Sequence, residues 1–73
     1  MNDSQVKEMI LKALRAHGSM TSHELEAVLK MEWTSFSAQL IAMIRNTFNP
    51  TGEIGATRVQ FRGTVYHLPD QTP

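Results

Sequence analysis

The side chains that could catalyse a reaction or bind a metal are few and widely spaced in this sequence. Cys is absent, which excludes disulfides, thiolate chemistry and Cys-based zinc sites. His17, His23 and His67 stand apart, and none has a second His or a carboxylate at ligand spacing. Neither a nucleophile elbow nor a phosphate-binding or dinucleotide-binding loop occurs. We therefore expect no enzyme activity, no metal, no cofactor and no small-molecule substrate.

Length and charge restrict the remaining classes. With 73 residues, of which 41% are hydrophobic, the chain has enough apolar surface for one small domain. No apolar run reaches the length of a membrane span or a secretion signal, so we expect a cytoplasmic protein without membrane contact. Seven Lys and Arg balance seven Asp and Glu, which argues against a generic nucleic-acid coat. The basic residues of the second half are all Arg, which reads guanine edges and narrow minor grooves: Arg45, Arg58 and Arg62.

The first segment has the periodicity of an amphipathic helix. Asn2, Asp3 and Ser4 are alternative N-caps of a helix that runs to about His17. Gly18 is placed to close this helix as an αL residue. The apolar stripe recurs at i, i+3, i+4, i+7 and i+8 and consists of Val6, Met9, Ile10, Ala13 and Leu14.

A second and a third helix are indicated after residue 20. Thr21 and Glu24 have the Thr-x-x-Glu spacing of a capping box. Lys30 ends this segment with a charge suited to a helix C-terminus. The next apolar face, with helical spacing, consists of Phe36, Leu40, Met43 and Ile44. Two short helices joined by three or four residues cross steeply, which is the arrangement of a helix-turn-helix.

The stretch TSHELEAVLKMEWTSFSAQL resembles the helix-turn-helix of bacterial and phage proteins. Both combine an acidic and apolar first helix with a second helix rich in Ser and Thr. Met31 stands where such motifs bury an aliphatic side chain, and Lys30 stands where the turn usually carries Gly or another small residue. Glu32 stands where a Ser or Thr cap is usual, so Thr34 is an alternative cap for the second helix.

The pattern becomes strand-like in the last third of the chain. A loop is indicated over residues 47–55, which contain one Pro and two Gly. Two segments of alternating character follow, residues 57–61 and 64–68, so we expect a β-hairpin. A two-residue Arg62-Gly63 turn would pair Phe61 with Thr64, and a longer loop with Gly63 in αL is the alternative.

Alternation along this hairpin predicts one buried and one exposed face. The face toward the helices would carry Val59, Phe61, Tyr66 and Leu68. The outer face would carry Arg58, Gln60, Val65 and His67. A hairpin of this size is marginal alone, so it must pack on the helices.

Three helices followed by a hairpin are the element order of the winged helix, a family that this chain resembles over residues 4–68. The expected fold class is therefore α+β, a winged helix-turn-helix in which a three-helix bundle is followed by a two-stranded β-hairpin wing. Residues 69–73 are expected to form a flexible tail. The small size is similar to that of winged-helix regulators encoded by phages and mobile elements.

This resemblance implies sequence-specific binding of double-stranded DNA by a small transcriptional regulator. It makes Thr34–Asn46 the recognition helix and the hairpin a wing. The expected DNA contacts are Thr34, Ser35, Ser37, Ala38, Gln39 and Arg45 on the helix, and Arg58, Gln60 and Arg62 on the wing. A homodimer would use two half-sites and so double the few phosphate contacts of a chain this short.

A protein partner is the alternative to DNA. Ala38, Ile41 and Ala42 form a small and fairly apolar patch on the same helix, and the first two turns of that helix carry no Lys or Arg. Together with the zero net charge, this patch fits a protein–protein interaction module on a winged-helix scaffold, an inhibitor or adaptor that does not bind DNA. Trp33 would be an anchor of such an interface if its side chain is exposed.

Overall fold

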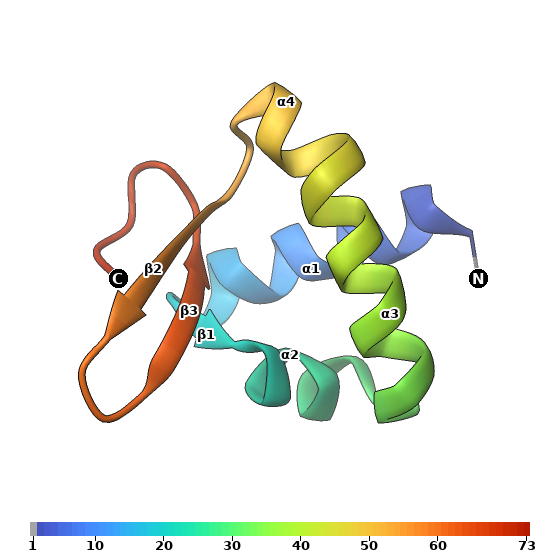
Figure 1. Ribbon diagram of the computed structural model, residues 1–73, viewed down its shortest axis with the longest axis horizontal. Coiled ribbons are helices and arrows are strands. Elements are labelled where there is room, and N and C mark those ends of the chain that lie inside the picture. Colours follow the sequence, from blue (N-terminus) through green and yellow to red (C-terminus); the bar gives the residue numbers. More distant parts are fainter. Residues whose placement is uncertain (1) are drawn as a thin grey trace.

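A computed structural model describes residues 2–73 as a small α+β fold. Along its longest axis the molecule measures 30 Å, with the β-sheet at one end and the third helix toward the other (Figure 1). The first helix crosses behind the third, and the second lies below both in this view (Figure 1). Most of the hydrophobic core lies between these helices and one face of the sheet.

Helix α1 spans Asp3–His17, as its apolar stripe predicts. Of the three alternative caps, Asn2 is used, and it forms a capping box with Gln5. The N–H of Gly18 donates to the carbonyl of Leu14 and ends the helix, with φ +83° and ψ −157°. Gly18 therefore has the positive φ that favours glycine, but it lies outside the αL region in which we expected it.

The second and third helices are α2, Ser22–Leu29, and α3, Trp33–Met43. The capping box at the start of α2 is confirmed: the Glu24 backbone N–H donates to Thr21 Oγ1, and the Thr21 N–H donates to Glu24 Oε1. Lys30 closes α2 in the αL conformation, with φ +56°. The N-cap of α3 is Glu32 and not Thr34, because the helix begins one residue before Thr34, and Glu32 caps it without a side-chain hydrogen bond.

The helical region continues past α3, so the prediction of a loop over all of residues 47–55 is wrong. A π-helical segment η1, Ile44–Phe48, and a short helix α4, Asn49–Thr51, follow without a break. The side chain of Phe48 is fully buried in the core. The wider π turn comes just before Pro50, whose ring cannot follow a regular α-helical turn. The helix ends at Gly52, which has φ +70°.

The sheet has three antiparallel strands, whereas we expected two. Strands β2, Gly55–Val59, and β3, Gly63–His67, form the hairpin. The short link between α1 and α2 adds β1, Met20–Thr21, on the other side of β3, which gives the order β1-β3-β2 (Figure 1). Because β3 is central, the hairpin is held to the start of α2 by backbone pairing.

The predicted register of the hairpin is wrong. Val59 pairs with Gly63, and Gln60, Phe61 and Arg62 form a three-residue loop, closed by a 3.1 Å hydrogen bond from the Arg62 N–H to the Val59 carbonyl. This is close to the alternative of a longer loop, with Gly63 at φ +85°.

The predicted faces of the hairpin are wrong for β2: Val59 lies on the face of Val65, and Arg58, which pairs with Thr64, lies on the face of Tyr66. Val65, expected on the outer face, is fully buried on the central strand, and Phe61, expected in the core, is exposed at the turn. Tyr66 and Leu68 do pack against the core, as expected.

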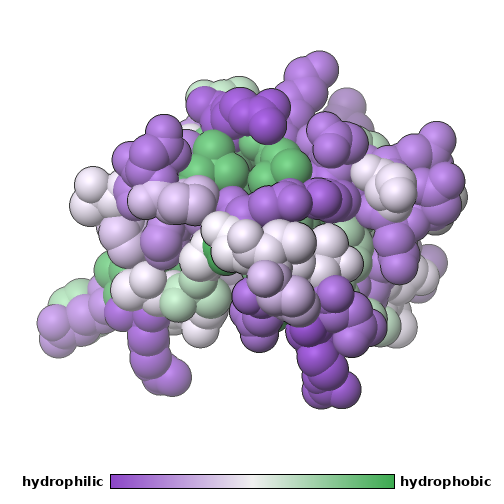
Figure 2. Space-filling model, turned by 90° about the horizontal axis from the view of Figure 1, so that it is seen from above, coloured by the Kyte–Doolittle hydropathy of each residue, from purple (hydrophilic) through white to green (hydrophobic). Residues whose placement is uncertain are grey.

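The hydrophobic core is one cluster, which includes buried side chains of the three helices, of η1 and of residue 54. Leu14, Leu25 and Leu40 are almost completely buried at its centre. On the side seen from above Figure 1, hydrophilic side chains surround a limited apolar area (Figure 2). Near the C-terminus, Gln71 donates from Nε2 to the carbonyl of Leu14 and accepts the N–H of Leu68, at 2.6 and 3.0 Å. Within residues 2–73, no helix combines the length and apolar character needed to cross a membrane.

Candidate nucleic-acid interface

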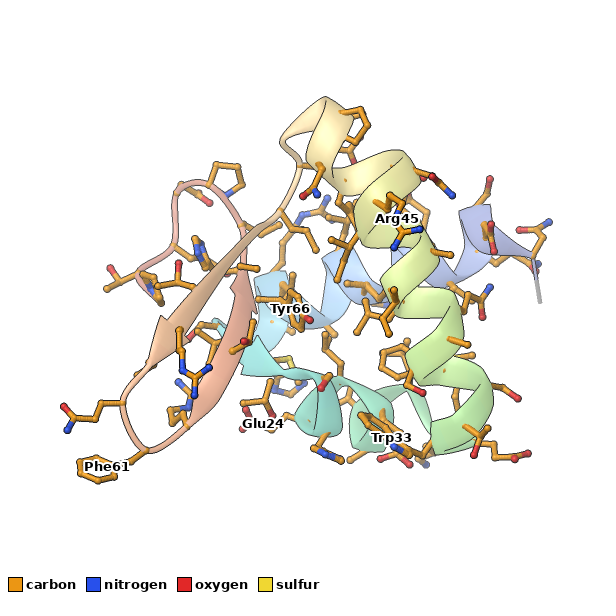
Figure 3. All side chains as sticks on the ribbon, in the orientation of Figure 1. Glu24, Trp33, Arg45, Phe61 and Tyr66 are labelled. Carbon is orange, nitrogen blue, oxygen red and sulfur yellow. The ribbon has the colours of Figure 1, made fainter. Side chains whose placement is uncertain are left out.

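One face of α3 and its continuation carries the residues that sequence reasoning assigned to DNA contact. Thr34, Ala38, Ile41 and Arg45 recur at i, i+4, i+7 and i+11, and all four side chains are exposed. Ser35 and Ala42 are exposed beside this row. Small and hydroxyl-bearing residues at the start of the face allow close approach, while the single cation, Arg45, lies on η1 at the far end (Figure 3). Hydroxyl groups can bond to phosphates or base edges, and small side chains let a helix enter the major groove deeply.

Ser37 and Gln39 lie at the edges of this face and bond within the protein. Ser37 Oγ donates to the carbonyl of Thr34 at 3.2 Å. Gln39 Nε2 donates to Asp3 Oδ1 at 2.8 Å, so its amide is turned toward the first residue of α1. Because of this bond to Asp3, the Gln39 side chain points away from the exposed row. To reach a base edge, it would have to leave Asp3.

The hairpin presents its charged residues in two different ways. Arg58 and Gln60 are exposed, and within residues 2–73 Arg58 has no salt bridge. Arg62 instead turns toward α2, where its guanidinium lies 3.0 Å from Glu24 Oε1 and 3.4 Å from the carbonyl of Ser19. Glu24 therefore belongs to the capping box and to an ion pair with the hairpin at the same time (Figure 3).

The double role of Glu24 changes its acidity. The hydrogen bond from the Thr21 backbone N–H lowers the pKa of Glu24, and the hydrogen bond from Arg62 lowers it further. About half of each side chain is exposed, so the Glu24–Arg62 pair is worth at most about 1 kcal/mol. Arg62 can thus be released to a phosphate at small cost, but its charge is already partly neutralised in the free protein.

Tyr66 and His67 are neighbours on β3, so their side chains lie on opposite faces of the sheet. Tyr66, which comes from β3, points toward the space between the sheet and α3 (Figure 3). Its partial burial raises the pKa of the phenol above its usual value. His67 bonds to Thr57 Oγ1 at 3.0 Å, and its ring lies so close to Gly55 that a Cβ on that residue would come within 2.9 Å of it. A side chain at residue 55 would therefore require the His67 ring to move.

An aromatic pair covers the turn between α2 and α3. The ring of Trp33 stacks on His23 with centroids 4.0 Å apart and an interplanar angle of 16°. Trp33 is also 6.5 Å from the ring of Phe36, which is in the core. With 37% of its surface exposed, Trp33 is held by its neighbours on one side and open to solvent on the other. It is therefore partly a packing residue of the turn.

Phe61 is the exposed residue that sequence reasoning missed. It occupies the turn of the hairpin with 98% of its surface exposed and points away from the helices (Figure 3). Its φ is +69°, which only Gly, Asn and Asp adopt with ease. The signal available in the sequence was its position directly before the Arg-Gly pair, where a one-residue shift of the turn moves it out of the strand.

Comparison with models of known protein families, with curated protein sequences and with solved structures gives no match for this chain. The functional interpretation therefore depends on the topology and on the surface described above.

Proposed function

We propose that this protein is a winged-helix regulator that binds double-stranded DNA in a sequence-specific manner and acts on transcription. The observation that carries the proposal is the exposed row on α3, combined with a hairpin toward the other end of the molecule, in the element order α1-β1-α2-α3-η1-α4-β2-β3. In this proposal α3 enters the major groove, and the hairpin is the wing that contacts the flanking backbone or minor groove.

The charges of the chain determine how strongly one copy would bind DNA. Arg45 and Arg58 carry no salt bridge within residues 2–73, and the net charge of the chain is zero. Few phosphates are neutralised by one copy, so non-specific affinity is weak. We propose that two copies bind two half-sites about one helical turn apart, which doubles the phosphate contacts. A palindromic or pseudo-palindromic target is the expected consequence.

Selection from a pool of random duplexes, with the protein's own upstream region added, tests the proposal. Fluorescence anisotropy at about 50 mM salt then measures the affinity of the enriched sequences. We expect a recurring consensus. Ser35→Ala should reduce discrimination at one base pair of that consensus by about 1–3 kcal/mol if its hydroxyl reads a base edge. The proposal fails if no duplex is enriched or bound under these conditions.

A protein-interaction module is the second candidate function. Ile41 is 60% exposed between two exposed Ala residues on α3, and Arg62 pairs with an acidic residue and adds little to a basic surface. This surface also suits an apolar patch on a partner protein. Ile41→Asp separates the candidates in pull-downs from host extract with and without nuclease treatment. A partner that depends on nucleic acid supports the first proposal, and one that is lost only with Ile41→Asp supports the second.

A further inference from the structure

Phe61, in the turn of the hairpin, has two unfavourable features, a positive φ and an aromatic ring exposed to water. Val59 accepts the N–H of Arg62, and the φ of the turn is positive at its third residue, Phe61, and not at its second, Gln60. This is the pattern of a type II turn, which is normally met by Gly or Asn at the third residue. Phe61 is also an aromatic side chain that is almost fully in water. Neither feature contributes packing to the free protein.

Residues that break a local rule without a structural gain concentrate at functional sites. The other non-glycine residue with positive φ among residues 2–73 is Lys30, which closes α2. Phe61 closes no helix and contacts no core. The conformation of its turn instead directs the ring away from the protein, at the far end of the hairpin (Figure 3).

The surroundings of Phe61 favour DNA as the group that receives it. Gln60 is adjacent and Arg58 lies on the strand that leads to the turn, and both are exposed. The minor groove, about 6 Å wide, excludes a two-stranded ribbon but admits single side chains from its tip. The hairpin and α3 lie toward opposite ends of a molecule 30 Å long. A major groove and the next minor groove are about 17 Å apart, half of the helical repeat, so the molecule can reach both.

We propose that Phe61 is a wedge: its ring enters the minor groove beside the α3 site, inserts between two base pairs and bends the duplex. This inference rests on the proposed DNA binding and adds that the protein deforms its target. Apolar wedges of this kind unstack a base step and kink DNA by about 20–90° toward the major groove. Flexible pyrimidine–purine steps are the cheapest to open, so one is expected at the wing position of the target.

The test uses Phe61→Asn in the full chain on the selected duplex. Asn tolerates positive φ and removes the ring, and the ring makes no core contact, so the variant keeps its fold and its thermal unfolding midpoint does not fall. End-labelled duplexes report bending by energy transfer, and 2-aminopurine at the wing step reports unstacking. The parent should bend the duplex and raise 2-aminopurine fluorescence several-fold, whereas Phe61→Asn should do neither.

Two controls make the outcome specific to an apolar wedge. Phe61→Leu, which keeps an apolar side chain, should restore most of the bend. Gln60→Ala, which changes the neighbouring turn residue, should weaken binding without removing the bend. Phe61→Asn should lower affinity about tenfold and leave the salt dependence unchanged, because the ring neutralises no phosphate.

Each contrary result has a distinct meaning. A bend and a fluorescence change that persist in Phe61→Asn overturn the wedge while leaving the proposed function in place. The same holds if Phe61→Asn abolishes capture of a partner protein and leaves DNA bending intact, which would assign the ring to a protein pocket. A parent protein that binds no duplex removes the proposed function and the wedge together.

Discussion

At the scale of single residues, two side chains occupy a backbone conformation that L-residues rarely adopt, and they do so for different reasons. At Lys30 the backbone N–H donates to the Glu26 carbonyl at 2.8 Å, and the positive φ turns the chain toward α3. Phe61 directs a ring into solvent. The first requirement belongs to the fold and is met better by Gly, whereas the second needs the side chain itself.

Lys30→Gly should therefore stabilise the protein. Removing the Cβ at φ +56° relieves about 1 kcal/mol of steric cost. The greater conformational freedom of Gly in the unfolded chain offsets part of this gain. Urea unfolding followed by circular dichroism measures the change. The matched control is Lys12→Gly, an exposed Lys inside α1, which should lose about 1 kcal/mol. A loss of stability in both variants would contradict the role given to Lys30.

The lowered pKa of Glu24 predicts that part of the free energy of unfolding is lost in acid. Its pKa is lowered in the folded protein, first by the Thr21 N–H and then by Arg62, so the folded state binds its proton less readily than the unfolded state. The resulting stability is present above the unfolded pKa, about 4.3, and is lost as the pH falls through the lower, folded value. Glu24→Gln keeps a capping box but loses the charge, so the variant should show a flatter loss of stability below about pH 5.

The measurement for this prediction is a series of urea titrations from neutral to acidic pH. Glu8→Gln, at an exposed position of α1 without a side-chain hydrogen bond among residues 2–73, is the control and should follow the parent curve. If Glu24→Gln also follows the parent over the whole range, Glu24 does not link the capping box to the hairpin in solution. The effect is small because the pair is half exposed.

At the scale of elements, the three helices and some of their ends were predictable, but the continuation of the helical region past α3 was not. Apolar spacing located α1, α2 and α3, and the capping box fixed the start of α2 at the right residue. Pro50 and the two Gly residues predict a loop from residue 47, but Phe36, Leu40, Ile44 and Phe48, four apart, continue one helical face. Burial of an aromatic ring outweighs the cost of a π turn before Pro50, and local propensity alone does not show this.

Phe48→Ala is the test of that helical extension. A ring that is fully buried in the core should cost about 3–5 kcal/mol when removed, a large share of the stability of a domain this small. A Phe in a mobile loop would cost little. Pro50→Ala, at an exposed position of the same segment, is the control and should change stability by less than about 1 kcal/mol. Similar unfolding of parent and Phe48→Ala would place residue 48 outside the core.

The hairpin shows what sequence reasoning lacks for strands. Val, Tyr, Thr and Phe all suit a strand, so alternation allowed two registers of opposite face. The observed register is accompanied by the pairing of Met20 with Tyr66 and by the ion pair of Arg62 with Glu24, residues more than 35 positions apart. Contacts this distant along the chain leave no local pattern. The exposed surface of α3 was predictable for the opposite reason, since helical spacing is local.

At the scale of the whole molecule, a neutral chain is proposed to bind a polyanion. A neutral protein binds DNA weakly where the sequence is not its target, because few phosphates are neutralised. Contacts to base edges then determine at which sequence the protein binds. Two of the cations that have no salt bridge within residues 2–73 belong to the proposed DNA surface, and they stand on separate elements, Arg45 on η1 and Arg58 on β2. Each should neutralise about one phosphate in the complex. The salt dependence of binding counts these contacts directly.

The decisive measurement is the slope of log Kobs against log salt concentration for the selected duplex, with the parent and with Arg58→Ala. We predict a linear fall for the parent and a slope smaller by about one for the variant, with affinity reduced on all sequences alike. Thr64→Ala, at an exposed and uncharged position opposite Arg58, should keep the parent slope. Absence of any duplex binding at about 50 mM salt, or an identical slope for Arg58→Ala, would contradict the winged-helix account of this surface.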